Sequence, residues 1–178
     1  HDPYNLYFTP DGKFAIVMQE ASKKVDFRDS QNLKEVNPVS VPCAGVNHAD
    51  FSADGNFFIA TCEFEGALIM FDTQKQKLIA KVYLPKTYTK DPMPQDIKLS
   101  PDGKSIYFNG GNHVDLPKNL NASRLAPNSW DEDHLLPRMW DANGHARGIL
   151  APGGYIARAD PDGKHVELFC GGFRNQYA

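Results

Sequence analysis

Three residues with side chains that can bind metal ions or cross-link the chain lie close together in the sequence, at Cys43, His48 and Cys62. Two thiols can form a disulfide in an oxidising compartment, and two thiolates with an imidazole can bind a metal ion. A third interpretation is that both cysteines are free and buried. The spacing matches no standard zinc pattern. Cys170 is expected to be a small apolar strand residue without a partner.

Polar residues also recur at one position relative to a repeated turn. The turn tripeptides are Pro10-Asp-Gly12, Ala53-Asp-Gly55 and Pro101-Asp-Gly103. Counting back five residues from the first position of each tripeptide gives Asn5, His48 and Asp96. We interpret Asn5 as structural. His48 and Asp96 are candidates for a ligand or metal site, and the alternative is that they are polar because they line a hydrated channel.

The repeated turns lie between short apolar segments, in residues 5–18, 48–62 and 96–108. An Asp-Gly pair between alternating apolar runs predicts a β-hairpin with a two-residue turn, in which both central residues favour positive φ. The turn glycines Gly12, Gly55 and Gly103 are separated by 43 and 48 residues. A repeat of this length with four short strands is typical of propeller blades.

Further strand patterns complete the first two units. They lie at residues 24–28 and 33–41 in the first unit, and at 67–72 and 78–84 in the second. The prolines of residues 85–94 exclude a central strand there. We therefore predict a single all-β domain over residues 1–178, a β-propeller of four-stranded blades with about three blades in this chain. The expected blades are residues 1–44, 45–88 and 89–178.

The third unit contains a long insert, about residues 109–153, without strand patterns. The Asp162-Gly163 turn that follows is expected to join the third and fourth strands of that blade. The carboxylates of Asp131 and Asp133 could bind a hard cation such as calcium, or belong to a solvated turn or helix start. His145 lies between small residues that would let a ligand approach. The other candidates in the insert are His113, Asp115, Glu132, His134 and Asp141.

Two known families resemble different parts of the chain. Residues 1–108 resemble the YVTN-type seven-bladed propeller repeats of bacterial secreted proteins, through the repeated hairpins and the segments 41–43, 48–55 and 61–64. Residues 109–178 resemble the sorbosone and glucose dehydrogenase-like quinoprotein propellers. That likeness rests on Gly111-Asn-His113, Leu135-Leu-Pro-Arg-Met-Trp-Asp141, Gly144-His-Ala146, Ala151-Pro-Gly-Gly154 and Gly172-Phe-Arg-Asn175.

The second resemblance implies a quinone cofactor, pyrroloquinoline quinone (PQQ), and calcium. In that family the residues matching Arg174 and Asn175 contact the carboxylates and carbonyls of the quinone, and a guanidinium suits an anionic ligand. The family's catalytic histidine has no counterpart here, because Met93-Pro-Gln-Asp96 occupies its place. His145 or His48 would then take the proton of the substrate hydroxyl. Both resemblances imply a periplasmic or extracellular location.

Composition disfavours several other classes of protein. A net charge of −3 gives no support to nucleic-acid binding. No apolar run approaches the roughly 20 residues of a membrane span, and the first residues have no signal-peptide pattern. We therefore interpret the sequence as a mature form or an excised piece. The nucleophile elbow, the phosphate loop and the zinc-protease motif are not present.

Three hypotheses for function follow. The first is a ligand-binding propeller that oxidises a sugar or alcohol with a bound quinone. The second is a non-catalytic propeller that binds a partner or small ligand, and the third is a metal- or haem-binding propeller using His48. Since propellers close with about 4–8 blades, three blades leave two open edges. Two copies would give six blades, and the alternative is a longer chain that contains the missing blades.

Overall fold

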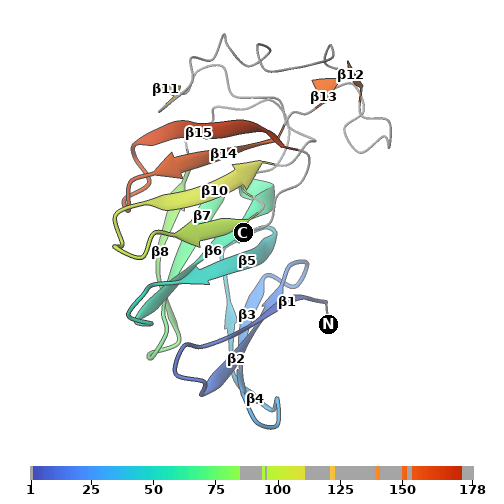
Figure 1. The fold of residues 1–178 in the computed structure, drawn as a ribbon. Coiled ribbons are helices and arrows are strands. Elements are labelled where there is room, and N and C mark those ends of the chain that lie inside the picture. The colour runs from blue at the N-terminus through green and yellow to red at the C-terminus, as the bar shows by residue number, and fades with distance from the viewer. Residues whose placement is uncertain are drawn as a thin grey trace.

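The computed structural model describes residues 2–84, 94, 96–110, 121–122, 139–140, 150–151 and 154–173. The described chain is all-β and forms three consecutive sheets, each with four antiparallel strands, to which the third sheet adds a fifth (Figure 1). The first sheet consists of β1 (Pro3–Phe8), β2 (Phe14–Gln19), β3 (Lys24–Asp29) and β4 (Glu35–Ser40). The second consists of β5 (Val46–Phe51), β6 (Phe57–Cys62), β7 (Ala67–Asp72) and β8 (Lys77–Tyr83).

The third sheet is built from β9 (Ile97–Leu99), β10 (Ile106–Gly110), β14 (Gly154–Ala159) and β15 (Val166–Phe173). It differs from the other two, because the short strand β11 (Asn121–Ala122) adds to β15 in parallel. A separate pair joins β12 (Met139–Trp140) to β13 (Leu150–Ala151). The segment expected to lack strands therefore contains three short ones. Their two-residue lengths are too short for sequence periodicity to reveal.

The helical part of the described chain is the three-residue 3₁₀ turn η1 (Glu63–Glu65). Within that part of the chain, no helix has the length and apolar character needed to cross a membrane.

The repeated turns occupy equivalent positions in the three sheets, as predicted. Gly12, Gly55 and Gly103 have φ values of 70°, 72° and 70°, and each joins the first and second strand of its sheet. Each glycine N–H donates to the carbonyl three residues earlier, at 2.8 or 2.9 Å. Gly163, with φ 71°, joins β14 to β15, as expected for the third and fourth strands.

The prediction that both central residues of these turns have positive φ was wrong. Asp11, Asp54 and Asp102 are absent from the described residues with positive φ. The turn is a longer loop in which Pro10-Asp11 form a type I turn and Gly12 takes the left-handed conformation. The same arrangement occurs in all three repeats, whether proline (Pro10, Pro101) or alanine (Ala53) precedes Asp-Gly. The Asp11 carboxylate then accepts the backbone N–H of Lys13 at 3.1 Å.

Two apolar layers hold the three sheets face to face. The layer between the first and second sheets is rich in phenylalanine, and the rings of Phe58 and Phe71 stack with centroids 5.0 Å apart. The layer between the second and third sheets is mostly aliphatic, with Ile59, Ile97 and Ile106 among its members. This face-to-face packing of consecutive four-stranded sheets is propeller-like.

The outer face of the first sheet, on the side away from the second sheet, carries exposed apolar side chains. Leu6 is 47% exposed and Phe8 is 54% exposed. The equivalent of Leu6 in the second sheet, Ala49, is 4% exposed, and its equivalent in the third, Ile97, is 1% exposed. At this position of the repeat the second and third sheets bury an apolar side chain against the preceding sheet, whereas the first sheet leaves it exposed.

Candidate functional site

The innermost strands of the first two sheets are irregular where polar residues gather. In β5, Asn47 and His48 lie opposite Thr61 alone on β6, and in β1, Tyr4 is the extra residue between Pro3 and Asn5. Such β-bulges bend a strand and redirect its side chains. Both irregularities lie at the same end of their strands, before the run into the Asp-Gly turn. The strands are therefore irregular at or next to Asn5 and His48, the positions found by counting back from the turns.

The structure brings together the three residues found by counting back from the turns. The amide nitrogen of Asn5 lies 3.3 Å from His48 Nδ1, and His48 Nδ1 lies 3.6 Å from Asp96 Oδ1. Asn5 also donates to the backbone carbonyl of Asn47 at 3.2 Å, which sets the orientation of its amide. We call Asn5, Tyr7, His48 and Asp96 the inner-strand site. Its members come from β1, β5 and the residue before β9.

Polar groups from both β1 and the residue before β9 surround Nδ1 of the His48 ring. The Tyr7 hydroxyl lies 3.3 Å from Nδ1, the same atom that Asn5 approaches. The ring of Tyr4 packs edge-on against His48 with centroids 5.9 Å apart. The imidazole is therefore oriented on one side by hydrogen bonds and on another by an aromatic contact.

Burial sets the charge state of His48. Its side chain is 15% exposed, and desolvation lowers its pKa below the usual 6.5, although the negative charges of Asp96 and Glu20 partly oppose this shift. His48 is consequently neutral at pH 7. Burial also raises the pKa of Tyr7, so its hydroxyl stays protonated. A neutral imidazole beside the Asp96 carboxylate can accept a proton from a hydroxyl group.

A buried polar network holds the His48 backbone in place. The His48 N–H donates to the Asn47 side-chain oxygen at 2.8 Å and lies 3.1 Å from the Thr61 hydroxyl. Thr61 in turn donates to Asn47, whose amide nitrogen donates to Glu63. Asn47 and Thr61 are fully buried. The bulge is thus stabilised by side chains that satisfy its irregular backbone groups.

The third sheet holds Asp96 in a similar way. The Asp96 N–H donates to the side-chain oxygen of Asn109 at 2.7 Å, and the Asn109 N–H donates back to the Asp96 carbonyl at 3.2 Å. One carboxylate oxygen of Asp96 accepts the N–H of Ile97 at 2.8 Å. Asn109 occupies on β10 the place that Thr61 occupies on β6. Equivalent residues therefore fix the start of the inner strand in two successive sheets.

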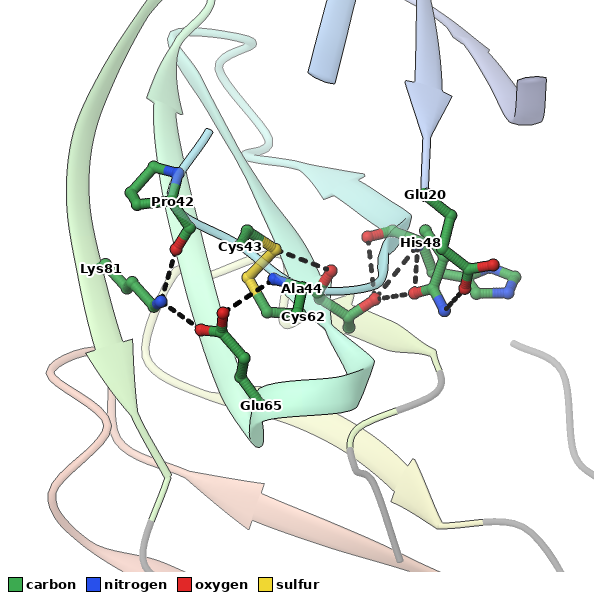
Figure 2. The surroundings of a disulfide bond; sticks show 10 residues. Glu20, Pro42, Cys43, Ala44, His48, Cys62, Glu65 and Lys81 are labelled. Carbon is green, nitrogen blue, oxygen red and sulfur yellow. Dashed lines mark hydrogen bonds and ion pairs between the residues drawn. A yellow bond between two sulfur atoms is a disulfide. The ribbon is translucent and has the colours of Figure 1, made fainter. Parts of the chain in front are cut away.

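The two cysteines of the second unit form a disulfide, Cys43–Cys62, with Cα atoms 5.4 Å apart. Figure 2 shows that this bond joins the segment before β5 to the end of β6, beside the network around His48. Because both sulfur atoms are used in the bond, the interpretations with a thiolate metal site or with free cysteines are wrong. Cys170 is the free cysteine, and burial raises the pKa of its thiol.

A second cluster braces the disulfide from its other side. Lys81 on β8 donates to Glu65 and to the carbonyl of Pro42, and Glu65 accepts the backbone N–H of Ala44 at 2.9 Å (Figure 2). Gly45 has φ 75°, and a Cβ there would lie 2.9 Å from the backbone nitrogen of Phe64. The disulfide and the hydrogen bonds of Glu65 and Lys81 therefore both hold the segment before β5. Together they fix where the strand with His48 begins.

Several predicted site residues lie outside the described residues. They are His145, Arg174, Asn175, Asp131 and Asp133, so the proposed quinone contacts and calcium ligands stay predictions. Within the described ranges, no group of three or more His, Cys, Asp or Glu side chains could hold a metal ion. Of the four residues predicted as metal ligands, His48 and Asp96 are adjacent. The other two, Asp131 and Asp133, are outside the described residues.

Sequence reasoning missed part of the inner-strand site. Tyr4 and Tyr7 flank Asn5 on β1 and both approach the His48 ring. Asn5 was interpreted as structural, yet its amide contacts the ring of His48 directly. The available signal was the position of Tyr7, which lies two residues beyond Asn5 and therefore shares its face of the strand. The bulge at Tyr4 has no sequence signature, so its contact was not predictable.

Comparisons with known proteins support the fold. The described fold is similar to the solved structure of Kuenenia stuttgartiensis hydrazine synthase, with a TM-score of 0.59 and 19% sequence identity. The match covers 94% of this chain and 37% of that chain. At this identity the likeness concerns the fold alone. No family model matches the sequence, and no curated protein matches it.

Proposed function

We propose that this chain is a propeller module that binds a small hydroxyl-bearing ligand, a sugar or an alcohol, at the inner-strand site. The observation that carries the proposal is the contact of a neutral, half-buried His48 with Asp96, Asn5 and Tyr7. Together these side chains offer a carboxylate, an amide, a phenol and an imidazole. Ligand sites typically combine such convergent polar groups with a rigid scaffold, and here the scaffold is three packed sheets.

The finer proposal about chemistry is that the ligand is oxidised with a bound quinone. PQQ, when bound, supplies a two-electron acceptor. The resemblance of residues 109–178 to quinoprotein propellers supports this idea, with Arg174 and Asn175 as quinone contacts and His145 or His48 as the proton acceptor. The position of His48 beside Asp96 is compatible with the acceptor role, because the carboxylate stabilises the imidazolium that forms. Calcium at Asp131 and Asp133 and a periplasmic or extracellular location belong to the same proposal.

The proposal that the three sheets are part of a closed ring rests on the outer face of the first sheet. Leu6 and Phe8 are exposed there, although their equivalents pack against a preceding sheet. An ion pair between the buried Asp26 and the partly exposed Arg28, at 2.6 Å, lies where the second sheet has apolar side chains. A further sheet would cover this face, contributed either by a second copy or by more blades of a longer chain.

Calorimetric titration with D-glucose tests the binding function. We expect saturable heat with the wild-type protein, and at least tenfold weaker binding for His48→Ala and Asp96→Asn, because the first removes the imidazole and the second removes the negative charge beside it. His165→Ala is the matched control, since His165 lies in the turn between β14 and β15, and it should bind normally.

Two results would reject this proposal. One is no saturable heat with either D-glucose or 1-butanol, and the other is binding that both site variants leave unchanged. Adding PQQ and calcium to the wild-type protein with its ligand separates the two finer hypotheses. Loss of quinone absorbance indicates oxidation, whereas binding without that loss indicates a non-catalytic module.

A further inference from the structure

A cavity of about 310 Å³ lies between the second and third sheets, at the end of the strands opposite the inner-strand site. The side chains of Phe57, Ile59, Met70, Leu99 and Ile106 line it. Its mouth lies between the β5–β6 turn, with Asp54, and the β9–β10 turn, with Asp102. The volume is at the lower end of the range for small-molecule pockets, roughly 300–1,000 Å³.

The cavity lies where the interface between the second and third sheets has smaller side chains than the interface between the first two. The strand register makes Leu99 and Ile106 the equivalents of Phe51 and Phe58. In the same way Met70 is the equivalent of Phe27. The interface between the first two sheets is filled by the rings of Phe14, Phe27, Phe51, Phe58 and Phe71, with neighbouring centroids 5.0–6.5 Å apart. The corresponding side chains at the next interface are Phe57, Met70, Leu99, Ile106 and Ala159.

A second departure from the repeat occurs at the mouth of the same cavity. Asp11 pairs with Lys13 at 3.2 Å, and Asp162 pairs with Lys164 at 3.1 Å. The residue at the place of these lysines in the β5–β6 turn is Asn56. It donates to Asp54 at 2.7 Å but brings no positive charge. Among the described residues, no ion pair involves Asp54.

The Asp54 carboxylate is also held in one orientation. One of its oxygens accepts the Ser52 hydroxyl at 2.6 Å and the Asn56 N–H at 3.0 Å. These hydrogen bonds, with the Ser52 contact the largest cause, lower the pKa of Asp54. The mouth of an apolar cavity thus presents, at Asp54, a fixed negative charge that no lysine of the β5–β6 turn neutralises. Charge complementarity favours a ligand with an apolar body and one positively charged group.

We propose that this cavity binds a small aromatic amine, with the ring among Phe57, Met70 and Leu99 and the ammonium group at Asp54. The ring would supply the aromatic volume that this interface lacks relative to the first one, and close packing there gains contacts that an unfilled space forfeits. The ammonium would take the place that Lys13 occupies beside Asp11 in the first sheet. This site is independent of the inner-strand site, which lies at the other end of the strands.

Titration with phenethylamine tests the proposal, with 2-phenylethanol as the uncharged comparison. We expect saturable binding of phenethylamine, at least tenfold tighter than that of 2-phenylethanol. Asp54→Asn should weaken phenethylamine binding about tenfold, to the level of the alcohol, because it removes the charge but keeps the side-chain shape. Asp11→Asn, the same change in the equivalent turn of the first sheet, should leave binding unchanged.

A cavity-filling variant distinguishes a loss of binding from a loss of folding. Leu99→Phe restores the side chain found at the equivalent position 51, so it should abolish binding while raising the thermal unfolding midpoint. The proposal is overturned if phenethylamine fails to bind at millimolar concentration. It is equally overturned if the alcohol binds as tightly as the amine, or if Leu99→Phe binds phenethylamine as well as the wild type does.

Discussion

Replacing Phe58 by alanine is expected to lower the free energy of unfolding by about 3–5 kcal/mol. Phe58 is fully buried, and its ring lies within 5.0–6.2 Å of the rings of Phe27, Phe51 and Phe71, centroid to centroid. Truncation removes the transfer free energy of the ring and leaves a cavity that surrounding rings from two sheets cannot fill. A loss of this size is a large part of the roughly 5–15 kcal/mol by which domains are stable.

Equilibrium unfolding in urea measures this effect, and Phe64→Ala is the matched control. Phe64 is 55% exposed, so the same change there should cost about 1 kcal/mol or less. Equal losses for the two variants would mean that the phenylalanine cluster does not hold the first two sheets together. The urea dependence of unfolding also reports whether these sheets unfold as one unit, since a single transition requires the interface to be intact.

Removing the Cys43–Cys62 disulfide is expected to lower the free energy of unfolding by about 3 kcal/mol. The bond closes a loop with a sequence separation of 19, and without it the unfolded chain gains conformational freedom. Cys43→Ala with Cys62→Ala removes the bond without leaving a lone thiol. Cys170→Ala is the control, because Cys170 is the free cysteine, and it should change stability little.

A thiol count checks the bond itself before stability is compared. The denatured protein should show one free thiol before reduction and three after it, since the sequence contains three cysteines. Three thiols before reduction, in protein prepared under oxidising conditions, would contradict the disulfide. A double alanine variant as stable as the wild type would instead show that the bond forms but does not stabilise the fold.

The fold was predictable because the repeat is carried by local patterns. Glycine at positions 12, 55 and 103 marks the same hairpin three times, and the apolar runs on either side have strand periodicity. The turn type was not predicted correctly, because Asp-Gly also suits a longer loop in which only the glycine has positive φ. The short strands β11 to β13 depend on tertiary pairing and leave no periodic signal.

The candidate site was predictable in position but not in contacts. Equivalent places in the repeat identified Asn5, His48 and Asp96, which the structure brings together. The bulges at Tyr4 and at Asn47–His48 could not be read from the sequence, because a bulge changes strand register without changing residue types. The interface cavity was also missed, since it depends on comparing residues in different strands of adjacent sheets.

Measuring the protonation of His48 by NMR as a function of pH tests the inner-strand site most directly. Because burial disfavours the imidazolium, the midpoint should lie below the usual 6.5. The unfolded chain then binds the proton more readily than the folded chain. The contribution of His48 to stability is therefore complete above pH 6.5 and is lost as the pH falls through the folded-state pKa.

The Asp96→Asn variant makes the measurement specific to the site. Its midpoint should be lower than that of the wild type, because the variant removes a negative charge 3.6 Å from the ring. With D-glucose bound at pH 7, the resonances of His48 should shift in the wild type. A midpoint at or above 6.5, or one that Asp96→Asn leaves unchanged, would contradict the convergence of these residues in a single half-buried site.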